Sequence, residues 1–180
     1  MGEEYAEDAP FLYFVSHTDP ELVEVVREGR KKDFADFQIE GQFLDPFSPD
    51  TFNKCQLDWE QRQEGKHKVM LELYQHLIQL RRTIPALKTL DKQNIEASVI
   101  EDDKLMFLHR WSQDSQFFCI MNFSDKDTTF KATPPNGNWQ KILDSSEPKW
   151  MGSGSLLPDK LMQGQELTIK THSFGLYQQR

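Results

Sequence analysis

The sequence has little positive charge, few cysteines and no long apolar run, and each shortage excludes a class of protein. Its 180 residues include 21 lysines and arginines against 29 aspartates and glutamates, which gives a net charge of −8. A chain with this balance repels phosphate backbones and lacks the basic surface that nucleic-acid-binding proteins use. We therefore expect no nucleic-acid partner.

Cysteine is scarce as well. Cys55 and Cys119 lie far apart, and neither belongs to a CxxC pair, so the sequence predicts no disulfide framework and no zinc site. No apolar stretch approaches the roughly 20 residues that a membrane span requires, and no signal peptide is recognisable. These absences favour a protein of the reducing cytoplasm with no membrane partner.

Two helical patterns occupy the first half of the chain. Pro20 follows the capping residues Thr18 and Asp19, so we expect a helix to begin there. From Asp58 to about Ala86, apolar residues recur every three to four positions, which predicts a long helix with one wide apolar face. The residues between these helices, Gln38 to Asp50, contain turn signals and are expected to form a loop.

Beyond Leu90 the pattern changes from helix to strand. Seven short segments are rich in β-forming residues and separated by turn signals: EASVIE, LMFLHRW, QFFCIMNF, TTFKA, WQKILD, ELTIK and SFGLYQQ. Short strands at this spacing predict an antiparallel sandwich or barrel. The turn GSGS at 152–155 lacks the lysine of a phosphate-binding loop, and we expect it to be flexible. The predicted fold class is α+β, with a boundary near residue 88.

Acidic residues gather at the start of the chain. Glu3, Glu4, Glu7 and Asp8 are of interest because paired carboxylates carry out glycoside hydrolysis. Adjacent residues of a strand point to opposite sides, however, so Glu3 and Glu4 cannot face each other across one sugar bond. The alternative is that these polar groups position a neighbour or a ligand hydroxyl.

Aromatic residues follow, and they have two interpretations. Rings such as those of Tyr5, Phe11, Tyr13 and Phe14 can stack on sugar faces or can belong to a core, and Tyr5 is the strongest candidate for sugar contact. The basic run from Arg27 to Lys32 is expected to be a solvated helix end, with ligand binding as the alternative. The five histidines show no HExxH or other metal spacing. The residues alone therefore predict no metal, no cofactor and no complete catalytic set.

Several motifs in fixed order resemble one family. They are MGEEY, PFLYF, DPELVEVVREGRKK, DPFSPDTFNKCQLDW, NFSD and HSFGLY. Together they resemble the C-terminal part of the maltooligosyltrehalose trehalohydrolases, glycosidases of the α-amylase superfamily. In that family MGEEYG belongs to the eighth strand of a (β/α)8 barrel, so the resemblance implies that Met1 is internal to a longer enzyme. Ala6 stands where the family usually has glycine.

The resemblance also implies a domain organisation. Residues 1–88 would be the last strand, loops and helices of an incomplete (β/α)8 catalytic barrel, and residues 89–180 its C-terminal β-sandwich. The catalytic aspartate, glutamate and second aspartate of the family come from strands upstream of MGEEY, so no catalytic residue is assigned here. Glu4 and Tyr5, singled out above as polar and aromatic candidates, are the predicted substrate-binding residues.

We expect the chain to be an inactive fragment of a cofactor-independent glycoside hydrolase. The complete parent would hydrolyse the α-1,4-glucosidic bond next to the terminal trehalose unit of maltooligosyltrehalose, with retention of configuration. The alternatives are a stand-alone sugar-binding or interaction module and a fragment of a glucan branching enzyme. The apolar helix face, with Val69, Leu73, Leu77 and Ile84, is expected to pack on the sandwich or to mediate self-association.

Overall fold

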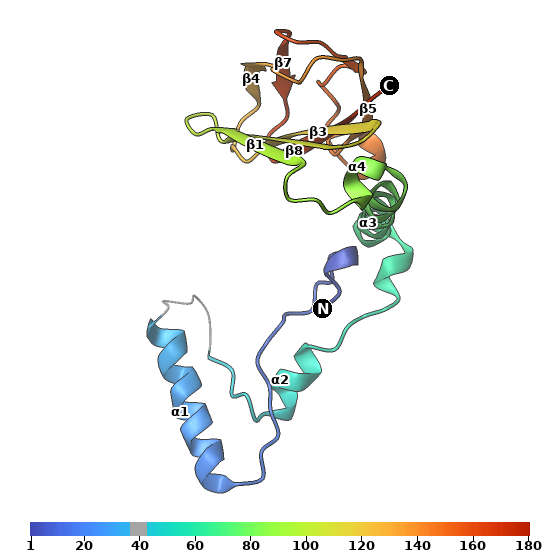
Figure 1. Cartoon of the computed structure of the whole chain (residues 1–180). Coiled ribbons are helices and arrows are strands. Elements are labelled where there is room, and N and C mark those ends of the chain that lie inside the picture. The colour runs from blue at the N-terminus through green and yellow to red at the C-terminus, as the bar shows by residue number, and fades with distance from the viewer. Residues whose placement is uncertain (37–42) are drawn as a thin grey trace. The chain divides into compact units, whose positions relative to one another are not determined.

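A computed structural model describes residues 1–36 and 43–180, so the expected loop from Gln38 to Asp50 lies partly outside the described residues. The chain divides into two compact units, Met1–Lys68 and Val69–Arg180. The helical elements, shown in Figure 1, are η1 (Glu3–Tyr5), α1 (Pro20–Asp36), α2 (Pro49–Lys54), η2 (Gln61–Gln63), α3 (Gly65–Thr83), α4 (Pro85–Lys88) and η3 (Pro148–Trp150). The strands are β1 (Ile95–Ile100), β2 (Leu105–Ser112), β3 (Ser115–Asn122), β4 (Thr128–Lys131), β5 (Trp139–Asp144), β6 (Lys160–Leu161), β7 (Glu166–Ile169) and β8 (Ser173–Gln179).

Helix α1 begins where the sequence predicts. The Asp19 carboxylate accepts hydrogen bonds from the backbone N–H groups of Glu21, at 2.9 Å, and Leu22, at 3.3 Å. Helix α2 was not predicted, and the end of the expected loop at Asp50 is wrong, because Pro49 and Asp50 already belong to this helix. The Ser48 hydroxyl accepts from the Asp50 N–H at 3.2 Å, and Pro49 occupies the first helical position, which proline favours.

Helix α3 is shorter than its apolar pattern suggested. It begins at Gly65, whose positive φ of 55° separates it from the short η2 turn before it. It ends at Thr83, because Pro85 pushes Ile84 into an extended conformation and starts α4. From Val69 onward, α3 belongs to the same compact unit as the strands. The compact units therefore divide after Lys68 and not near residue 88.

The strands form two antiparallel sheets. The larger sheet has the order β1-β2-β3-β8-β5-β6, and the smaller one pairs β4 with β7. All seven strand segments expected from the sequence are present within a residue or two of their predicted bounds. The sequence analysis missed β6, because two residues are too few to show a strand pattern.

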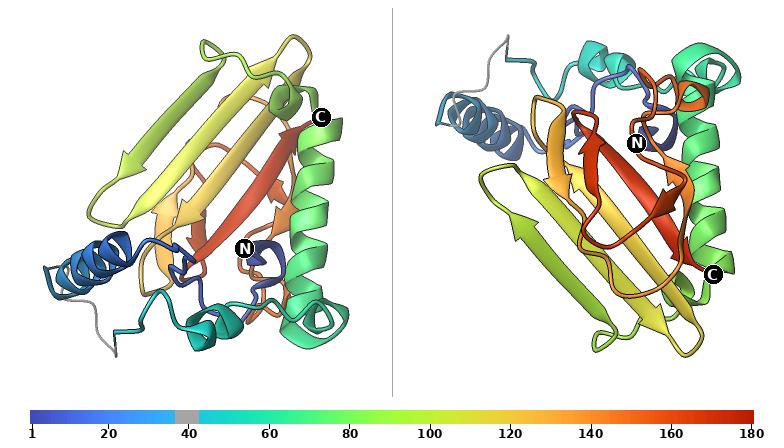
Figure 2. Two further views of the ribbon diagram at one scale, coloured as in Figure 1. Left: turned by 90° about the horizontal axis from the view of Figure 1, so that it is seen from below. Right: turned by 90° about the horizontal axis from the view of Figure 1, so that it is seen from above.

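The two sheets enclose a hydrophobic core. Its buried residues come from both sheets and their connections: Leu105, Phe107, Phe118, Ile120, Phe130, Ala132, Trp139, Leu157, Leu161, Leu167, Ile169 and Tyr177. Figure 1 shows β4 and β7 on one side of the larger sheet, and Figure 2 shows the larger sheet from either side. The expected α+β fold, with helices followed by an antiparallel sandwich, is confirmed.

A second core lies on the opposite face of the larger sheet. Ile84 and Ala86 from the α4 region are buried there with Phe117 and Cys119 of β3, and the partly buried Leu73, Leu77 and Leu80 of α3 pack against them. Strand β3 is therefore covered on both faces, which explains its continuous apolar run. The apolar face of α3 packs on the sandwich, as the first of the two expected arrangements requires.

The GSGS turn is tied down, contrary to the expectation of flexibility. The Gly154 N–H donates to the Ser146 carbonyl at 2.8 Å, and the Ser155 hydroxyl donates to Asp144 at 2.5 Å. Asp144 is fully buried, so this hydroxyl satisfies a carboxylate that water cannot reach. A Cβ on Gly152 would lie 2.2 Å from the Ser146 backbone, so only glycine fits at this position.

Candidate functional site

The candidate site is built around the tight turn at the start of the chain. Residues Glu3–Tyr5 form the 3-10 turn η1, so the expectation that Glu3 and Glu4 alternate along a strand is wrong for this structure. The residues on either side, Gly2 and Ala6, both adopt the left-handed conformation, with φ of 75° and 54°. A Cβ on Gly2 would lie 2.6 Å from the Glu7 Cβ, so this position requires glycine. The turn buries Tyr5 and leaves Glu4 exposed to solvent.

Glu7 holds the turn together. One carboxylate oxygen accepts from the Ala9 N–H at 2.9 Å, and the other accepts from the Tyr5 hydroxyl and from the Asp58 N–H, both at 2.9 Å. The hydrogen bond from Ala9, with those from Tyr5 and Asp58, lowers the pKa of Glu7 below its ordinary value against the opposing effect of desolvation. This carboxylate therefore joins the N-terminal turn to a segment about fifty residues along the chain.

Trp59 lies next to the turn, on the segment that Glu7 holds. Its ring centroid is 6.1 Å from that of Tyr5, and the guanidinium carbon of Arg62 lies 5.3 Å from the Trp59 ring centroid. Burial and the bond to Glu7 raise the pKa of Tyr5, the charge of Glu4 raises it further, and that of Arg62 opposes the rise. The charges of Glu4 and Arg62 thus both act on the Tyr5 phenol.

The first residues of α3 complete the cluster. The Lys66 ammonium donates to Asp8 at 2.8 Å and lowers the pKa of that carboxyl. His67 Nδ1 lies 2.9 Å from the Tyr5 carbonyl oxygen, which can only accept, so Nδ1 carries the hydrogen. No metal spacing drew attention to His67 in the sequence, yet its ring fixes the backbone of the turn.

The two residues predicted to bind substrate differ in accessibility. Glu4 is exposed, and its carboxylate can reach a ligand hydroxyl. Tyr5 is only 1% exposed, and its hydroxyl is bonded to Glu7, so its ring offers no open face for stacking in this structure. The assignment of both residues as substrate-binding stays a prediction, with a positioning role for Tyr5.

The other predicted aromatic candidates have separate places. Phe11 is 79% exposed, and Tyr13 lies under the Arg30 guanidinium, 4.6 Å from its ring centroid. Phe14 packs edge to face against Phe52, with their ring centroids 5.2 Å apart. Tyr13 and Phe14 thus contact different later segments of the first unit, whereas Phe11 is exposed to solvent.

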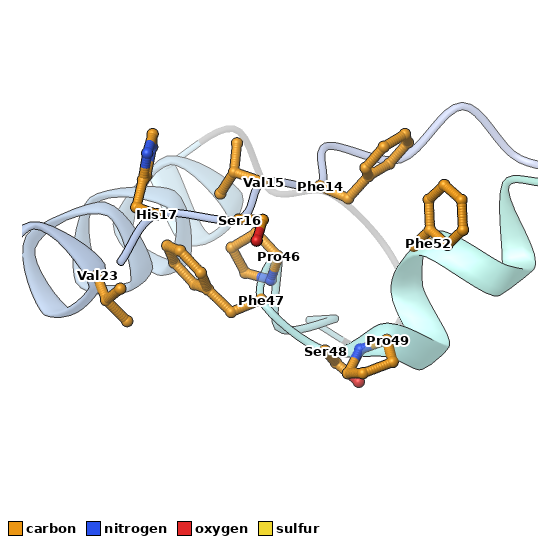
Figure 3. Close-up of a pocket in the computed structure, with 10 residues that line it drawn as sticks. All are labelled: Phe14, Val15, Ser16, His17, Val23, Pro46, Phe47, Ser48, Pro49 and Phe52. Atoms are coloured by element: carbon orange, nitrogen blue, oxygen red, sulfur yellow. The ribbon is translucent and has the colours of Figure 1, made fainter. Parts of the chain in front are cut away.

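A groove in the first unit is lined by aromatic and apolar side chains. Its volume is about 700 Å³, and its walls, shown in Figure 3, are Phe14, Val15, Ser16, His17, Val23, Pro46, Phe47, Ser48, Pro49 and Phe52. The Val15 N–H donates to the Pro46 carbonyl at 3.0 Å, which joins the two sides of the groove. Most of these side chains are apolar, with Ser16, His17 and Ser48 as the polar ones, so the groove suits mainly apolar contacts.

The basic run of α1 is largely paired within its unit. Arg27 bonds to Asp45 at 3.2 Å and to Glu24 at 2.9 Å, and the bond to Asp45 raises the pKa of the arginine. Arg30 lies 3.5 Å from Asp33. These contacts favour a structural role for Arg27 and Arg30 over ligand binding. The expected position at a helix end is wrong, because α1 continues to Asp36 and has no basic residue in its last turn.

The described residues contain no arrangement typical of metal binding or thiol chemistry. Within residues 1–36 and 43–180, no three histidine, cysteine or acidic side chains are placed to hold a metal ion. Burial raises the pKa of Cys119 to about 12, so its thiol is inert, and the Cys55 Sγ donates to the Thr51 carbonyl at 3.2 Å. No described helix is both long and apolar enough to cross a membrane.

Comparison with known proteins supplies the family context. Residues 94–160 match a family described as a domain of unknown function (DUF3459). The chain is 41% identical over 159 residues to a malto-oligosyltrehalose trehalohydrolase of Brevibacterium helvolum, covering 88% of this chain and 26% of that protein. It is 37% identical over 127 residues to the protein of the same name from Rhizobium sp. (strain M-11), and this match covers 70% of this chain and 21% of that protein.

Solved structures agree on the fold. A protein from Salmonella typhimurium assigned as an α-amylase matches the whole of this chain with a TM-score of 0.73 at 23% identity, and the match covers 27% of that protein. An α-amylase from H. orenii matches 74% of the chain with a TM-score of 0.51. The chain therefore spans only about a quarter of the proteins it matches. Its resemblance to the C-terminal portion of the malto-oligosyltrehalose trehalohydrolases, within an α-amylase fold, is confirmed.

Proposed function

We propose that this chain is the C-terminal part of a glycoside hydrolase that acts on maltooligosyltrehalose. The complete enzyme would hydrolyse the α-1,4-glucosidic bond next to the terminal trehalose unit, without a cofactor and in the cytoplasm. The observation that carries the proposal is the 41% identity over 88% of the chain to a protein named for this activity. In this proposal residues 1–88 close a (β/α)8 barrel and residues 89–180 form the appended sandwich.

The N-terminal turn is the part of the chain closest to the substrate in this proposal. Active sites of (β/α)8 barrels lie at the C-terminal ends of the strands, where the turn after the last strand is found. The exposed Glu4 carboxylate would accept hydrogen bonds from sugar hydroxyls. The buried Tyr5 would hold Glu4 in place through its bond to Glu7.

The chain by itself should have no hydrolase activity. A retaining glycosidase needs an acid and a nucleophile whose carboxyl groups are about 5 Å apart, and the resemblance assigns neither to these residues. We expect purified chain to release no trehalose from maltooligosyltrehalose. Trehalose release that is abolished by substituting a residue of this chain would contradict the proposal.

A chimera tests the positive half of the proposal. Residues 1–180 would replace the matching segment of the Brevibacterium helvolum enzyme, and trehalose release from maltooligosyltrehalose would be measured. An active chimera is the expected result, because the segment would supply only the closing part of the barrel and the sandwich. A chimera that folds cooperatively but has no activity would favour a different parent, such as a glucan branching enzyme.

The second candidate is a stand-alone sugar-binding or interaction module. It is favoured by one observation, which is that the unit Val69–Arg180 has hydrophobic cores on both faces of its larger sheet. Such a unit buries its own apolar surface and does not need a barrel for that purpose. Glucan binding by the chain together with an inactive chimera would favour this candidate.

Self-association through the α3 face is a further proposal, and we expect it to be weak. Leu73 and Leu77 pack against the sheet, and Ile84 is only 5% exposed, so a second copy would have to uncover them. Val69 is half-buried on the same helix. Light scattering of the chain and of a Leu73→Glu variant is the measurement, and a stable dimer that the substitution dissociates would support association through this face.

A further inference from the structure

Trp59 is the exposed aromatic side chain beside the N-terminal turn. It is 51% exposed, whereas the neighbouring Tyr5 is 1% exposed. We propose that Trp59, with Arg62 beside it, is the surface on which one glucosyl ring of an α-1,4-glucan stacks. The choice of glucan as the ligand rests on the proposed function, but the binding surface itself is inferred from the side chains.

The backbone that carries Trp59 is well anchored. The preceding Asp58 N–H donates to Glu7 at 2.9 Å, and the Asp58 carboxylate accepts from the Glu60 N–H at 3.1 Å. The Gln63 N–H then donates to the Glu60 carbonyl at 3.0 Å, within the η2 turn. A ring held on an anchored turn loses little conformational freedom when a ligand binds, so more of the contact energy contributes to affinity.

The surroundings of Trp59 suit a sugar ring. One face of a pyranose presents C–H groups that pack on an aromatic ring, while hydroxyl groups surround its rim. The Arg62 guanidinium carbon lies over the Trp59 ring, 5.3 Å from its centroid, so the sugar would stack on the part of the ring that stays exposed. The guanidinium N–H groups can donate to hydroxyls at the rim of that sugar. Glu4 is exposed on the same N-terminal turn as Tyr5, and its carboxylate can accept hydrogen bonds from sugar hydroxyls.

Tyr5 acts as the support of this surface. Its ring lies 6.1 Å from that of Trp59, tilted by 40°, and its hydroxyl is engaged by Glu7. The stacking role that the sequence suggested for Tyr5 is thus assigned to Trp59, whose ring Tyr5 supports. Glu4 keeps its predicted role as a polar contact to the ligand.

Binding can be tested on the whole chain with maltotriose as the probe. In ¹H–¹⁵N spectra we expect the Trp59 indole signal to shift on titration. The indole of Trp139, which is buried and donates to the Pro135 carbonyl at 2.7 Å, should not move. Trp59→Ala should weaken binding at least tenfold, and Trp59→Phe should retain most of it. The control Phe123→Ala, at an aromatic residue that is 57% exposed, should leave binding unchanged.

The active chimera described above separates this inference from the proposed function. There, Trp59→Ala should raise KM with kcat unchanged, as expected for a contact made equally in the ground and transition states. An active chimera in which Trp59→Ala and Trp59→Phe leave KM unchanged, with no indole shift in the chain, would overturn the stacking surface alone. A shift of the Trp59 signal with an inactive chimera would support the surface and overturn the hydrolase assignment.

Discussion

At the residue scale, Ala6 holds a conformation that glycine adopts at lower cost. Its φ of 54° lies in the left-handed region, which costs an L-residue roughly 1–2 kcal/mol, partly offset by the greater freedom of glycine in the unfolded chain. We expect Ala6→Gly to stabilise the N-terminal turn by roughly 0.5 kcal/mol. Denaturant unfolding monitored through the Trp59 signal is the measurement.

The matched control for that substitution is Ala9→Gly. Ala9 belongs to the same segment but does not have a positive φ. A glycine there only adds freedom to the unfolded chain, so the substitution should destabilise the unit by roughly 0.4–1 kcal/mol. Equal effects at the two positions would contradict the strain argument. The glycine expected at position 6 from the family resemblance is thus the residue that this backbone favours.

Glu7 predicts a pH dependence at the same scale. Its pKa in the folded chain is lowered, chiefly by the bond from the Ala9 N–H, so its stabilising contribution is complete above the unfolded pKa and is lost as pH falls through the folded pKa. We expect hydrogen exchange of the Ala9 and Asp58 amides to accelerate below about pH 4.5 beyond the intrinsic change in exchange rate. Glu7→Gln should remove this pH dependence, and the exposed control Glu64→Gln should preserve it.

At the element scale, α3 presents two faces with different roles. Leu77 packs against the second core, whereas the adjacent Ile78 is 48% exposed. Leu77→Ala should lower the free energy of unfolding by about 2 kcal/mol, because it leaves a cavity against the sheet. Ile78→Ala should change it by less than about 0.5 kcal/mol. Similar losses at both positions in urea unfolding would show that α3 does not pack through this face.

The sequence predicts best those elements that are long enough to show a pattern of residue types typical of a helix or a strand. Strand β8 was predicted at its observed bounds, because its seven residues are long enough to show a strand-forming composition. Helix α2 and strand β6 were missed, because a capped six-residue helix resembles a turn and a two-residue strand has no pattern. The start of α3 was misplaced, because periodicity does not reveal the conformation of Gly65.

The candidate site was only partly predictable for a related reason. The turn motif pointed to Glu4 and Tyr5, but burial depends on contacts with residues far along the chain. Tyr5 is closed off near Trp59 and Glu7, so the stacking role passes to Trp59. In the sequence Trp59 is the last residue of the family motif DPFSPDTFNKCQLDW, three residues before Arg62, but neither the motif nor a periodic pattern assigns a role to this pair.

At the scale of the whole molecule, the position of the boundary determines which part can fold alone. A division near residue 88 separates the strands from α3 and α4, whereas the compact units divide after Lys68. Residues 89–180 alone would leave the second core uncovered, because Ile84, Leu73 and Leu77 lie outside that range. Burying each such side chain is worth roughly 1.5–3 kcal/mol, so the loss approaches roughly 5 kcal/mol.

That loss is comparable to the entire stability of a small domain, which is about 5–15 kcal/mol. We therefore expect residues 69–180 to unfold in one cooperative transition and residues 89–180 to be several kcal/mol less stable, with a broad transition. Urea unfolding of the two pieces, followed by the fluorescence of the buried Trp139, is the measurement. If both pieces had the same midpoint and slope in urea, α3 and α4 would add no stability to the sandwich. The packing of these helices in the second core would then not stabilise the strands.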